Sequence, residues 1–477
     1  MLVQVRVKLA FLAMLKLDLK WTLLIGTIVR VVLMPFTAHP FDVSSWYKIS
    51  AGVLSHGVDV NGVLGSVRSL WELTLVPVAY SYGFLSPILG SRAISVSALS
   101  YQLNPQYGVS IIPDPLFCFL VKIPMLIADV GITLVLYKMC THFLGKETAG
   151  KAALLFYLNP FSIWISGAWG QMDALPTFFT IFSMYLLLKG KMVFSGFSLL
   201  VATLFKVFPA VFLVPASIYL LRKSSKERLL KYYSGFFVPF LMFLTVGLVI
   251  SGTGLVTDFA GLISGMVSGK TLVGVFGWGL TYWSVSLLYP LDATVWMPVV
   301  CVLMAILGSV SVYHVLRMRF IAPLKDLAAC TFLLAAAFLL SFPIVPENRF
   351  LWLMPFLTLM VVAGLVSWKA YGLVSVLSFV YVQKNFPYYL LPVATINQDI
   401  LKPLFSFAAP FGRVVGSALL PAPASAAVLA VLGTAFSVVL LVMYVRIIRE
   451  DKMTTNNQCL YSFRRVFEMC RKMYRQK

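Results

Sequence analysis

The chain has 477 residues, of which 60 % are hydrophobic and only 12 % are charged. A soluble domain carries roughly 25 % charged residues, so the composition excludes a soluble protein and leaves no room for a sizeable soluble domain. The formal net charge of +21 is typical of a membrane protein whose cytoplasmic loops collect lysine and arginine. Because no basic stripe is interleaved with aromatic residues, we expect no nucleic acid partner.

Apolar segments long enough to cross a bilayer recur along the chain. A span needs about 20 mostly apolar residues, because each backbone group must be paired within the segment. The first predicted span, 21–36, precedes a long outer loop, 37–113, in which short interfacial helices are expected to begin near Asp42 and near Pro87. Further spans are predicted at 115–138, 152–168, 174–188, 232–251, 293–316, 327–345, 350–367, 370–384 and 424–445.

The segment 194–221 predicts a broken pair of spans. Its halves, 194–205 and 208–221, are short and meet at Lys206 and Pro209, which indicates tilt, local thinning or a re-entrant shape. With this pair the total is about twelve spans in a single all-α transmembrane domain over 1–477. The Gly- and Trp-rich segment 252–292 is expected to lie along the outer interface, where aromatic rings favour the headgroup level.

Lysine and arginine clusters set the predicted sidedness. They follow or precede spans near 138–151, 189–191, 222–231 and 317–319, and they fill the tail, 446–477. These segments and both termini are therefore predicted to be cytoplasmic. The acidic residues that this topology leaves facing outward are Asp42, Asp59, Glu72, Asp114, Asp173, Asp258, Asp292, Glu347 and Asp399.

Asp42 and Asp173 stand out among the outward carboxylates. Asp42 lies in HPFDVSSWY and Asp173 in WISGAWGQMDALP, each among aromatic residues, glycine and proline at the membrane boundary. Aspartate is also a favoured helix N-cap, and each residue precedes a helix-like stretch. A capping role and a chemical role are therefore equal alternatives at this point.

A few charged residues fall inside predicted spans, namely Arg30, Lys122, Asp129 and Lys206. Such residues usually face the bundle interior and count as functional hypotheses. Lys122 and Asp129, seven residues apart, share one helical face, and structural contacts to neighbouring helices are the favoured interpretation for them. Lys206 is either a phosphate ligand or a snorkelling anchor. Glu347 and Arg349, in VPENRFLWLMP, are either functional or a simple surface pair.

Five stretches together resemble one family of membrane enzymes. They are HPFDVSSWY, FLVKIPMLIADVGITLVLYK, YLNPFSIWISGAWGQMDALP, LFKVFPAVFLVPASIYLLRK and PENRFLWLMP. Their order resembles the GT-C superfamily of polyprenyl-phosphate-sugar-dependent glycosyltransferases, in particular prokaryotic mannosyltransferases related to the GPI mannosyltransferases. The resemblance covers 37–225 and little of the C-terminal half. Two departures are Val43, where a second acidic residue is expected, and Pro346-Glu347-Asn348-Arg349 in place of His-Glu-Arg.

The resemblance implies a site and a reaction. Relatives use an acidic residue of the first outer loop as the base, which here is Asp42. Lys206, with Arg349, would hold the departing phosphate. Sugar or acceptor would be bound by Trp46, Trp169, Gln171 and Asp173. The implied reaction inverts the anomeric centre and moves a hexose, mannose by default, from a polyprenyl (dolichyl) phosphate to a lipid-linked glycan or glycolipid.

Further expectations concern partners and location. The partners implied are the polyprenyl-phosphate sugar, the glycan acceptor and membrane lipids. No metal or other cofactor is expected, because neither the six cysteines nor the four histidines show metal-ligand spacing. The tail carries no recognisable retention signal, so we expect a prokaryotic plasma membrane, with the reaction at its extracytoplasmic face.

Two other classes of protein remain open. A transporter or lipid flippase would explain the broken spans and the midplane charges, although no repeat relates the two halves. A non-catalytic partner in a glycan-building assembly would explain the divergent C-terminal half. A transferase should place Asp42 and Asp173 at an outer cavity that also opens sideways to lipid, whereas a transporter should place its charges around a midplane cavity.

Overall fold

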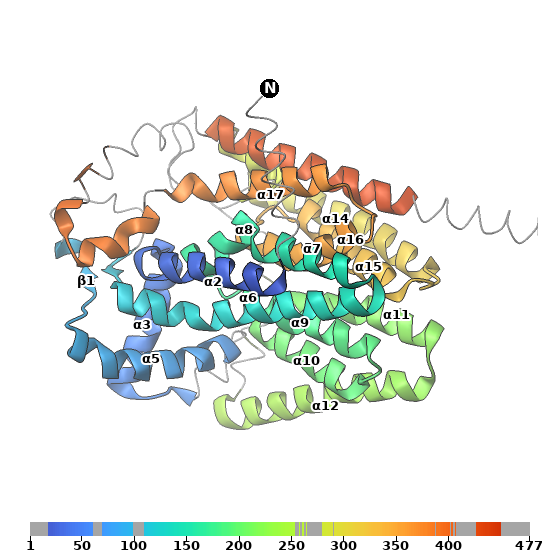
Figure 1. Cartoon of the computed structure of the whole chain (residues 1–477), viewed down its shortest axis with the longest axis horizontal. Coiled ribbons are helices and arrows are strands. Elements are labelled where there is room, and N and C mark those ends of the chain that lie inside the picture. The colour runs from blue at the N-terminus through green and yellow to red at the C-terminus, as the bar shows by residue number, and fades with distance from the viewer. Residues whose placement is uncertain are drawn as a thin grey trace, which may run out of the picture.

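The computed structural model describes residues 18–60, 69–98, 109–252, 279–289, 291–386, 388–400 and 426–449, with isolated positions at 257, 260–261, 264, 402–403 and 406. These residues form an all-α bundle in which many helices run lengthwise beside one another (Figure 1). The one sheet in this part of the chain pairs β1 (Ile94–Ser95) antiparallel with β2 (Ile111–Ile112). The expected all-α polytopic fold is confirmed.

The N-terminal half supplies most of the elements around the candidate site. In chain order they are α2 (Leu19–Phe36), α3 (Pro40–His56), α5 (Ser69–Leu89), α6 (Pro115–Phe143), α7 (Lys146–Tyr157), α8 (Pro160–Ile163), the π-helix η3 (Trp164–Trp169), α9 (Ala174–Leu188), α10 (Met192–Phe205), η4 (Phe208–Phe212), α11 (Leu213–Lys223) and α12 (Lys226–Ser251).

The C-terminal half completes the bundle. Its elements are η6 (Tyr282–Leu287), α14 (Ala293–Arg317), α15 (Pro323–Ser341), η7 (Glu347–Trp352), α16 (Met354–Val362), α17 (Trp368–Val382), η8 (Gln383–Asn385), η9 (Tyr388–Thr395), η10 (Gln398–Ile400) and a last described helix, Ala426–Arg449.

Six helices of the described residues are long and apolar enough to cross a membrane, namely α2, α6, α12, α14, α15 and Ala426–Arg449. Shorter apolar helices are α9, α10 and α17. Large apolar side chains such as Ile28, Met242 and Val302 are exposed on the long helices. A surface of that kind is a liability in water and is suited to lipid, so the chain is an integral membrane protein.

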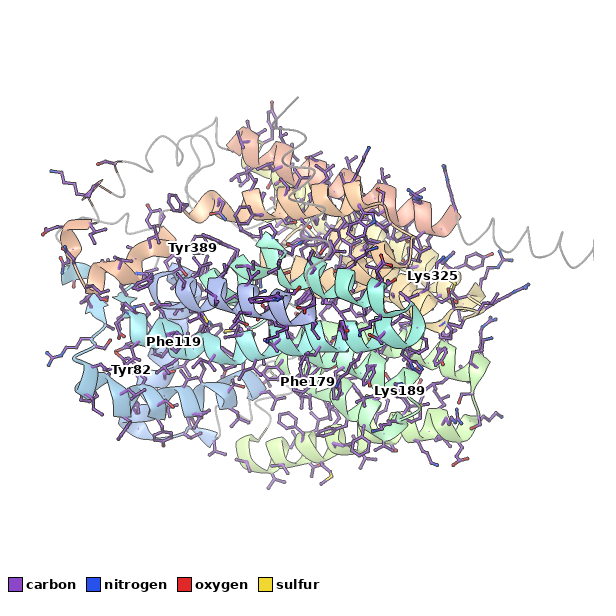
Figure 2. The ribbon with its side chains drawn as sticks, viewed as in Figure 1. Tyr82, Phe119, Phe179, Lys189, Lys325 and Tyr389 are labelled. Atoms are coloured by element: carbon purple, nitrogen blue, oxygen red, sulfur yellow. The ribbon has the colours of Figure 1, made fainter. Side chains whose placement is uncertain are left out.

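Labelled side chains identify the two ends of the bundle (Figure 2). Tyr82 and Tyr389 lie at one end, with Lys189 and Lys325 toward the other (Figure 2). The helices α3 and α5 and strand β1 lie at the Tyr82 end (Figure 1), hereafter the Asp42 end. The turn between α9 and α10 lies at the opposite end, hereafter the Lys191 end.

Two details of the predicted outer loop have different outcomes. A helix does begin near Asp42, since α3 starts at Pro40. The prediction of a helix starting near Pro87 is wrong, because Pro87 lies in the last turn of α5. The helix starts earlier because its buried side chains, Trp71, Leu75, Val78 and Tyr82, recur at helical spacing. The loop residues 61–68 and 99–108, most of 252–292 and the tail beyond 449 lie outside the described residues.

The predicted span over 152–168 is not one continuous helix. Its first part, α7, ends at Tyr157, and α8 begins at Pro160. Proline has no backbone N–H to continue the ladder, and the Asn159 side chain accepts hydrogen bonds from the amides of Phe161 and Ser162 at 2.9 and 3.4 Å. This cap starts α8, and the π-helix η3 follows it and ends at Trp169.

Candidate functional site

The backbone between η3 and α9 creates the site. The π-helix η3 ends at Gly170, which has a φ of +82° and donates its N–H to the carbonyl of Ile165 at 3.2 Å. Only glycine adopts this left-handed conformation readily. A Cβ at Gly170 would also lie 2.8 Å from Cε of Lys122. The resulting sharp turn presents Trp169 and Gln171 toward α3.

Buried Lys122 fixes this turn against the end of α2. Its Nζ donates to the carbonyls of Met34 and Ala168, both at 3.0 Å, and to that of Thr37. Three carbonyls saturate the three N–H groups of an ammonium. Lys122 is therefore a structural clamp between the segment that leads to α3 and the end of η3.

Asp42 lies in the first turn of α3, where a negative charge is favoured by the helix dipole. Its Oδ2 accepts hydrogen bonds from Trp169 Nε1 at 2.6 Å and from Gln171 Nε2 at 3.0 Å. No group among the described residues donates to Oδ1, and the side chain is 19 % exposed. The capping role is wrong for Asp42, because His39 occupies the N-cap and accepts the Asp42 amide.

His39 contacts both Asp42 and Trp169. Its ring stacks on Trp169 with centroids 4.3 Å apart, and its backbone N–H donates to the Trp169 carbonyl at 2.9 Å. Burial lowers the pKa of His39, an effect that Asp42 and Glu347 partly oppose. The neutral ring accepts the Asp42 amide at Nδ1, so the 3.3 Å approach of Nδ1 to the carboxylate is not an ion pair at neutral pH.

Asp173 is fully buried and is the centre of a second cluster. Its carboxylate accepts from Lys206 Nζ at 2.6 Å, from Trp352 Nε1 at 2.5 Å and from Asn348. Asp173 precedes α9, but its side chain makes no cap hydrogen bond, so the capping role is wrong here too. Lys206 follows α10 and remains 24 % exposed. Asp173 therefore joins α9, α10 and η7.

Arg349 lies beside this cluster. Its guanidinium donates to the carbonyl of Ile344 at 2.9 Å and lies over the ring of Phe342, 5.6 Å from its centroid. The alternative of a surface pair between Glu347 and Arg349 is wrong. Glu347 is buried, and its Oε1 lies 2.8 Å from Lys384 Nζ, an ion-pair distance without good hydrogen-bond alignment.

Of the predicted substrate-binding residues, Trp46 stands apart from these two clusters. It is 5 % exposed and packs edge-on against Trp71 with centroids 5.1 Å apart. Its indole Nε1 has no hydrogen-bond partner in the described part of the chain. Trp46 lies one helical turn after Asp42, so both share a face of α3. Its role in binding stays a prediction.

The other intramembrane charges form structural contacts. Arg30 Nε donates to Asp129 Oδ2 at 2.8 Å, and both side chains are fully buried. Arg30 also donates to the carbonyl of Tyr157 at 2.9 Å, and Ser166 donates to Asp129 at 2.5 Å. Since Lys122 is saturated by carbonyls, these charges have the packing role favoured from the sequence.

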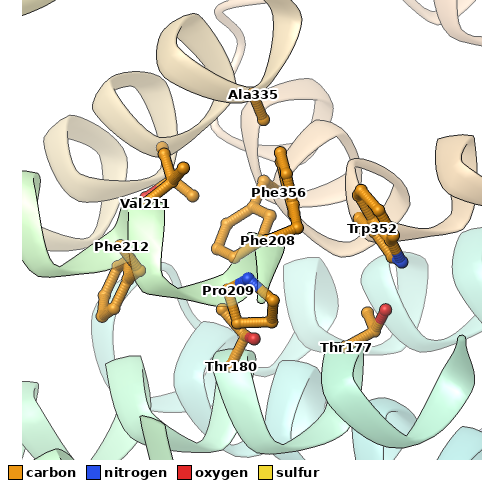
Figure 3. Close-up of a pocket in the computed structure, with 10 residues that line it drawn as sticks. Thr177, Thr180, Phe208, Pro209, Val211, Phe212, Ala335, Trp352 and Phe356 are labelled. Atoms are coloured by element: carbon orange, nitrogen blue, oxygen red, sulfur yellow. The ribbon is translucent and has the colours of Figure 1, made fainter. Parts of the chain in front are cut away.

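A small cavity lies next to the Asp173 cluster. It is lined by Trp352, Phe208, Pro209, Thr177 and other side chains of α9, η4, α15 and α16 (Figure 3). Its free space of about 20 Å³ holds no more than one water molecule. Neither Asp42 nor Asp173 lines it, so it is not the outer cavity expected of a transferase. Within the described residues, no three His, Cys, Asp or Glu side chains are placed to hold a metal ion.

Sequence reasoning missed several members of the site. His39 lies in HPFDVSSWY beside Asp42, but the spacing of the histidines bears only on a metal site. Asn348 and Trp352 lie in PENRFLWLMP beside the charged residues Glu347 and Arg349. Lys384 lies outside all five stretches that resemble the family. The neighbouring aromatic and amide side chains were the available signal.

Comparisons with known proteins match the chain to a family model and to solved structures. The family model "GPI transamidase subunit PIG-U" matches residues 96–265, which is less than half of the chain. The crystal structure of ArnT from Cupriavidus metallidurans bound to undecaprenyl phosphate matches with a TM-score of 0.44 and 13 % identity, covering 90 % of this chain and 77 % of that one. This likeness is too distant to carry an argument. No curated protein matches the chain.

Proposed function

We propose that this protein is a GT-C-type membrane glycosyltransferase. It transfers a hexose, with mannose the first sugar to test, from a polyprenyl phosphate to a lipid-linked glycan or glycolipid. The reaction takes place at the extracytoplasmic face, at the Asp42 end of the bundle. The membrane we propose is the plasma membrane of a prokaryote. The proposal rests on the sequence motifs and on the geometry around Asp42.

One observation carries the proposal, namely the way in which Asp42 is held. Two donors, Trp169 and Gln171, both bind Oδ2, while Oδ1 receives no hydrogen bond from the described residues. Two hydrogen bonds restrict the carboxylate to one orientation, and partial exposure leaves it accessible. A general base must be positioned to reach the proton that it removes. The fixed orientation and the partial exposure of the Asp42 carboxylate support this role.

The proposed step is a single displacement. The acceptor hydroxyl attacks C1 of the sugar and gives its proton to Asp42 Oδ1. The bond between C1 and the phosphate oxygen breaks, and the departing polyprenyl phosphate takes the electron pair. Attack opposite the leaving group inverts the anomeric centre, and no covalent sugar–enzyme intermediate is formed.

Lys206 and Arg349 are proposed to stabilise the departing phosphate. Lys206 uses one N–H on Asp173 at 2.6 Å, and an ammonium has three, so two remain for phosphate oxygens. Burial lowers the pKa of Lys206, and the negative charges of Asp173 and, more weakly, Asp42 oppose this effect. Trp46, Trp169, Gln171 and Asp173 are proposed to line the sugar or acceptor position.

The test is transfer of radiolabelled sugar from polyprenyl-phosphate-mannose to a lipid-extract acceptor by the purified full chain. Variant D42N should lose about 10²-fold to 10⁴-fold of the rate, the usual contribution of a general base. Variant D292N is the matched control, because Asp292 is another outward carboxylate that caps α14 and asparagine caps equally well. Equal rates for wild type, D42N and D292N would move the base elsewhere, with Asp173 next.

A second candidate follows from the match to the family model "GPI transamidase subunit PIG-U", namely that the chain is a subunit of a transamidase assembly. The matched stretch, 96–265, contains Asp173 and Lys206 but neither Asp42 nor Arg349. The match to that family therefore does not include Asp42, the proposed base. On this interpretation no variant forms glycosylated product, and the full chain purified gently from its own membrane carries partner subunits with peptide transamidation activity.

A further inference from the structure

A lateral groove lies between α9 and α10, away from the site described above. It has a volume of about 310 Å³ and is lined by four phenylalanines, Phe179, Phe182, Phe194 and Phe197, with Leu186, Ser198, Val201 and Lys191. Phe194 and Phe197 are 65 % and 48 % exposed. The groove is thus an aromatic recess on a surface that lies in the membrane.

The groove has the depth of one leaflet. On α10 its lining runs from Lys191, just before the helix, to Val201. Ten residues of α-helix rise about 15 Å, and the hydrocarbon core of a bilayer is about 30 Å thick. The groove therefore extends from one membrane surface to about the midplane.

A cation, Lys191, lies at the surface end of the groove and has no counterion among the described residues. No ion pair involves Lys191 or its neighbour Lys189 among the described residues, and Lys189 lies over the ring of Tyr185 at 6.0 Å. The glutamates Glu147 and Glu227 are instead paired with Lys151 and Lys231, at 2.6 and 2.5 Å. A negative charge from outside the chain is therefore favoured at Lys191.

We propose that this groove binds one anionic phospholipid of the leaflet at the Lys191 end. An acyl chain lies along the four phenylalanines, and the headgroup phosphate contacts Lys191, with Lys189 beside it. The site is independent of the proposed transfer reaction, because it uses none of the residues around Asp42 or Asp173. A prenyl tail anchored at Lys206 is the competing occupant, since Lys206 follows the opposite end of α10.

The test is native mass spectrometry of the full chain in a neutral detergent, titrated with phosphatidylglycerol or with phosphatidylcholine of the same acyl chains. Wild type should bind one phosphatidylglycerol in preference to phosphatidylcholine. Variant K191Q should weaken phosphatidylglycerol binding roughly fivefold, as expected for one lysine near an anionic surface, and leave phosphatidylcholine unchanged. Variant K146Q, which removes an exposed lysine outside the groove, should change neither affinity.

A second variant tests the groove itself. V201W fills the inner end of the groove and should weaken binding of both lipids. If V201W fails to fold, the comparison of K191Q with wild type still tests the proposal, because Lys191 is exposed. Equal binding of the two lipids by wild type, or equal effects of K191Q and K146Q, would overturn the proposal. Tighter binding of a polyprenyl phosphate that is lost in K206Q would also overturn it, in favour of the prenyl tail.

Discussion

Replacing Asp129 by asparagine is expected to destabilise the protein strongly, because it breaks a buried ion pair. Asp129 and Arg30 are both fully buried, and Arg30 Nε lies 2.8 Å from Asp129 Oδ2. In D129N the guanidinium keeps the carbonyls of Gly26 and Tyr157, at 3.2 and 2.9 Å, and the Tyr157 ring at 4.2 Å. It loses its only anion among the described residues.

The expected magnitude follows from this geometry. Removing one partner of a buried ion pair costs about 3–5 kcal/mol, because the other charge is left uncompensated. Replacing both partners by apolar side chains is often neutral. The double variant R30M/D129L should therefore fall within about 3 kcal/mol of wild type, since the Tyr157 carbonyl loses a donor at a cost of about 1–3 kcal/mol.

The assay is equilibrium unfolding of the purified chain in mixed micelles, with wild type, D129N, R30M, R30M/D129L and the control D292N. The control should lie within about 0.5 kcal/mol of wild type, as is usual for a surface substitution. A D129N cost below about 1 kcal/mol, or a double variant as unstable as the sum of the two singles, would refute the assignment of a buried structural pair.

Three further predictions concern the site. G170A should cost about 1–2 kcal/mol, the penalty for a left-handed non-glycine residue, whereas the control G150A, in open space within α7, should not destabilise; equal effects in an unfolding assay would contradict this. D173N should cost about 1.5–3 kcal/mol, the value of a hydrogen bond to a charged group, and should lower the pKa of Lys206 in a titration followed by NMR; an unchanged stability would mean that the cluster does not depend on charge. His39 has a lowered pKa, so the unfolded chain binds its proton more readily, and stability should fall as the pH drops below about 6.5; H39Q should flatten this part of the measured stability profile, and an unaltered profile would assign the slope to other groups.

Local sequence patterns determined the fold class and many helix boundaries. The span predicted at 174–188 coincides with α9, and the break predicted at Lys206 separates α10 from η4. Such features were predictable because burial in a membrane requires uninterrupted apolar runs, and because proline and charge interrupt those runs locally. The packing role favoured for Lys122 and Asp129 came from the same principle, that buried charges find partners within the bundle.

Only the tertiary structure decided which polar groups meet. Asp173 contacts Asn348 and Trp352, and Asp42 contacts Trp169 and Gln171. These partners are far apart in the sequence, so helical periodicity could not predict the contacts. The same holds for Arg30, whose partner is Asp129 of another helix. A hydrogen bond requires two groups within about 3 Å with the right alignment, and helix packing sets that distance. The sequence alone therefore indicated which residues are chemically unusual, whereas the packing of the helices determined how they are combined.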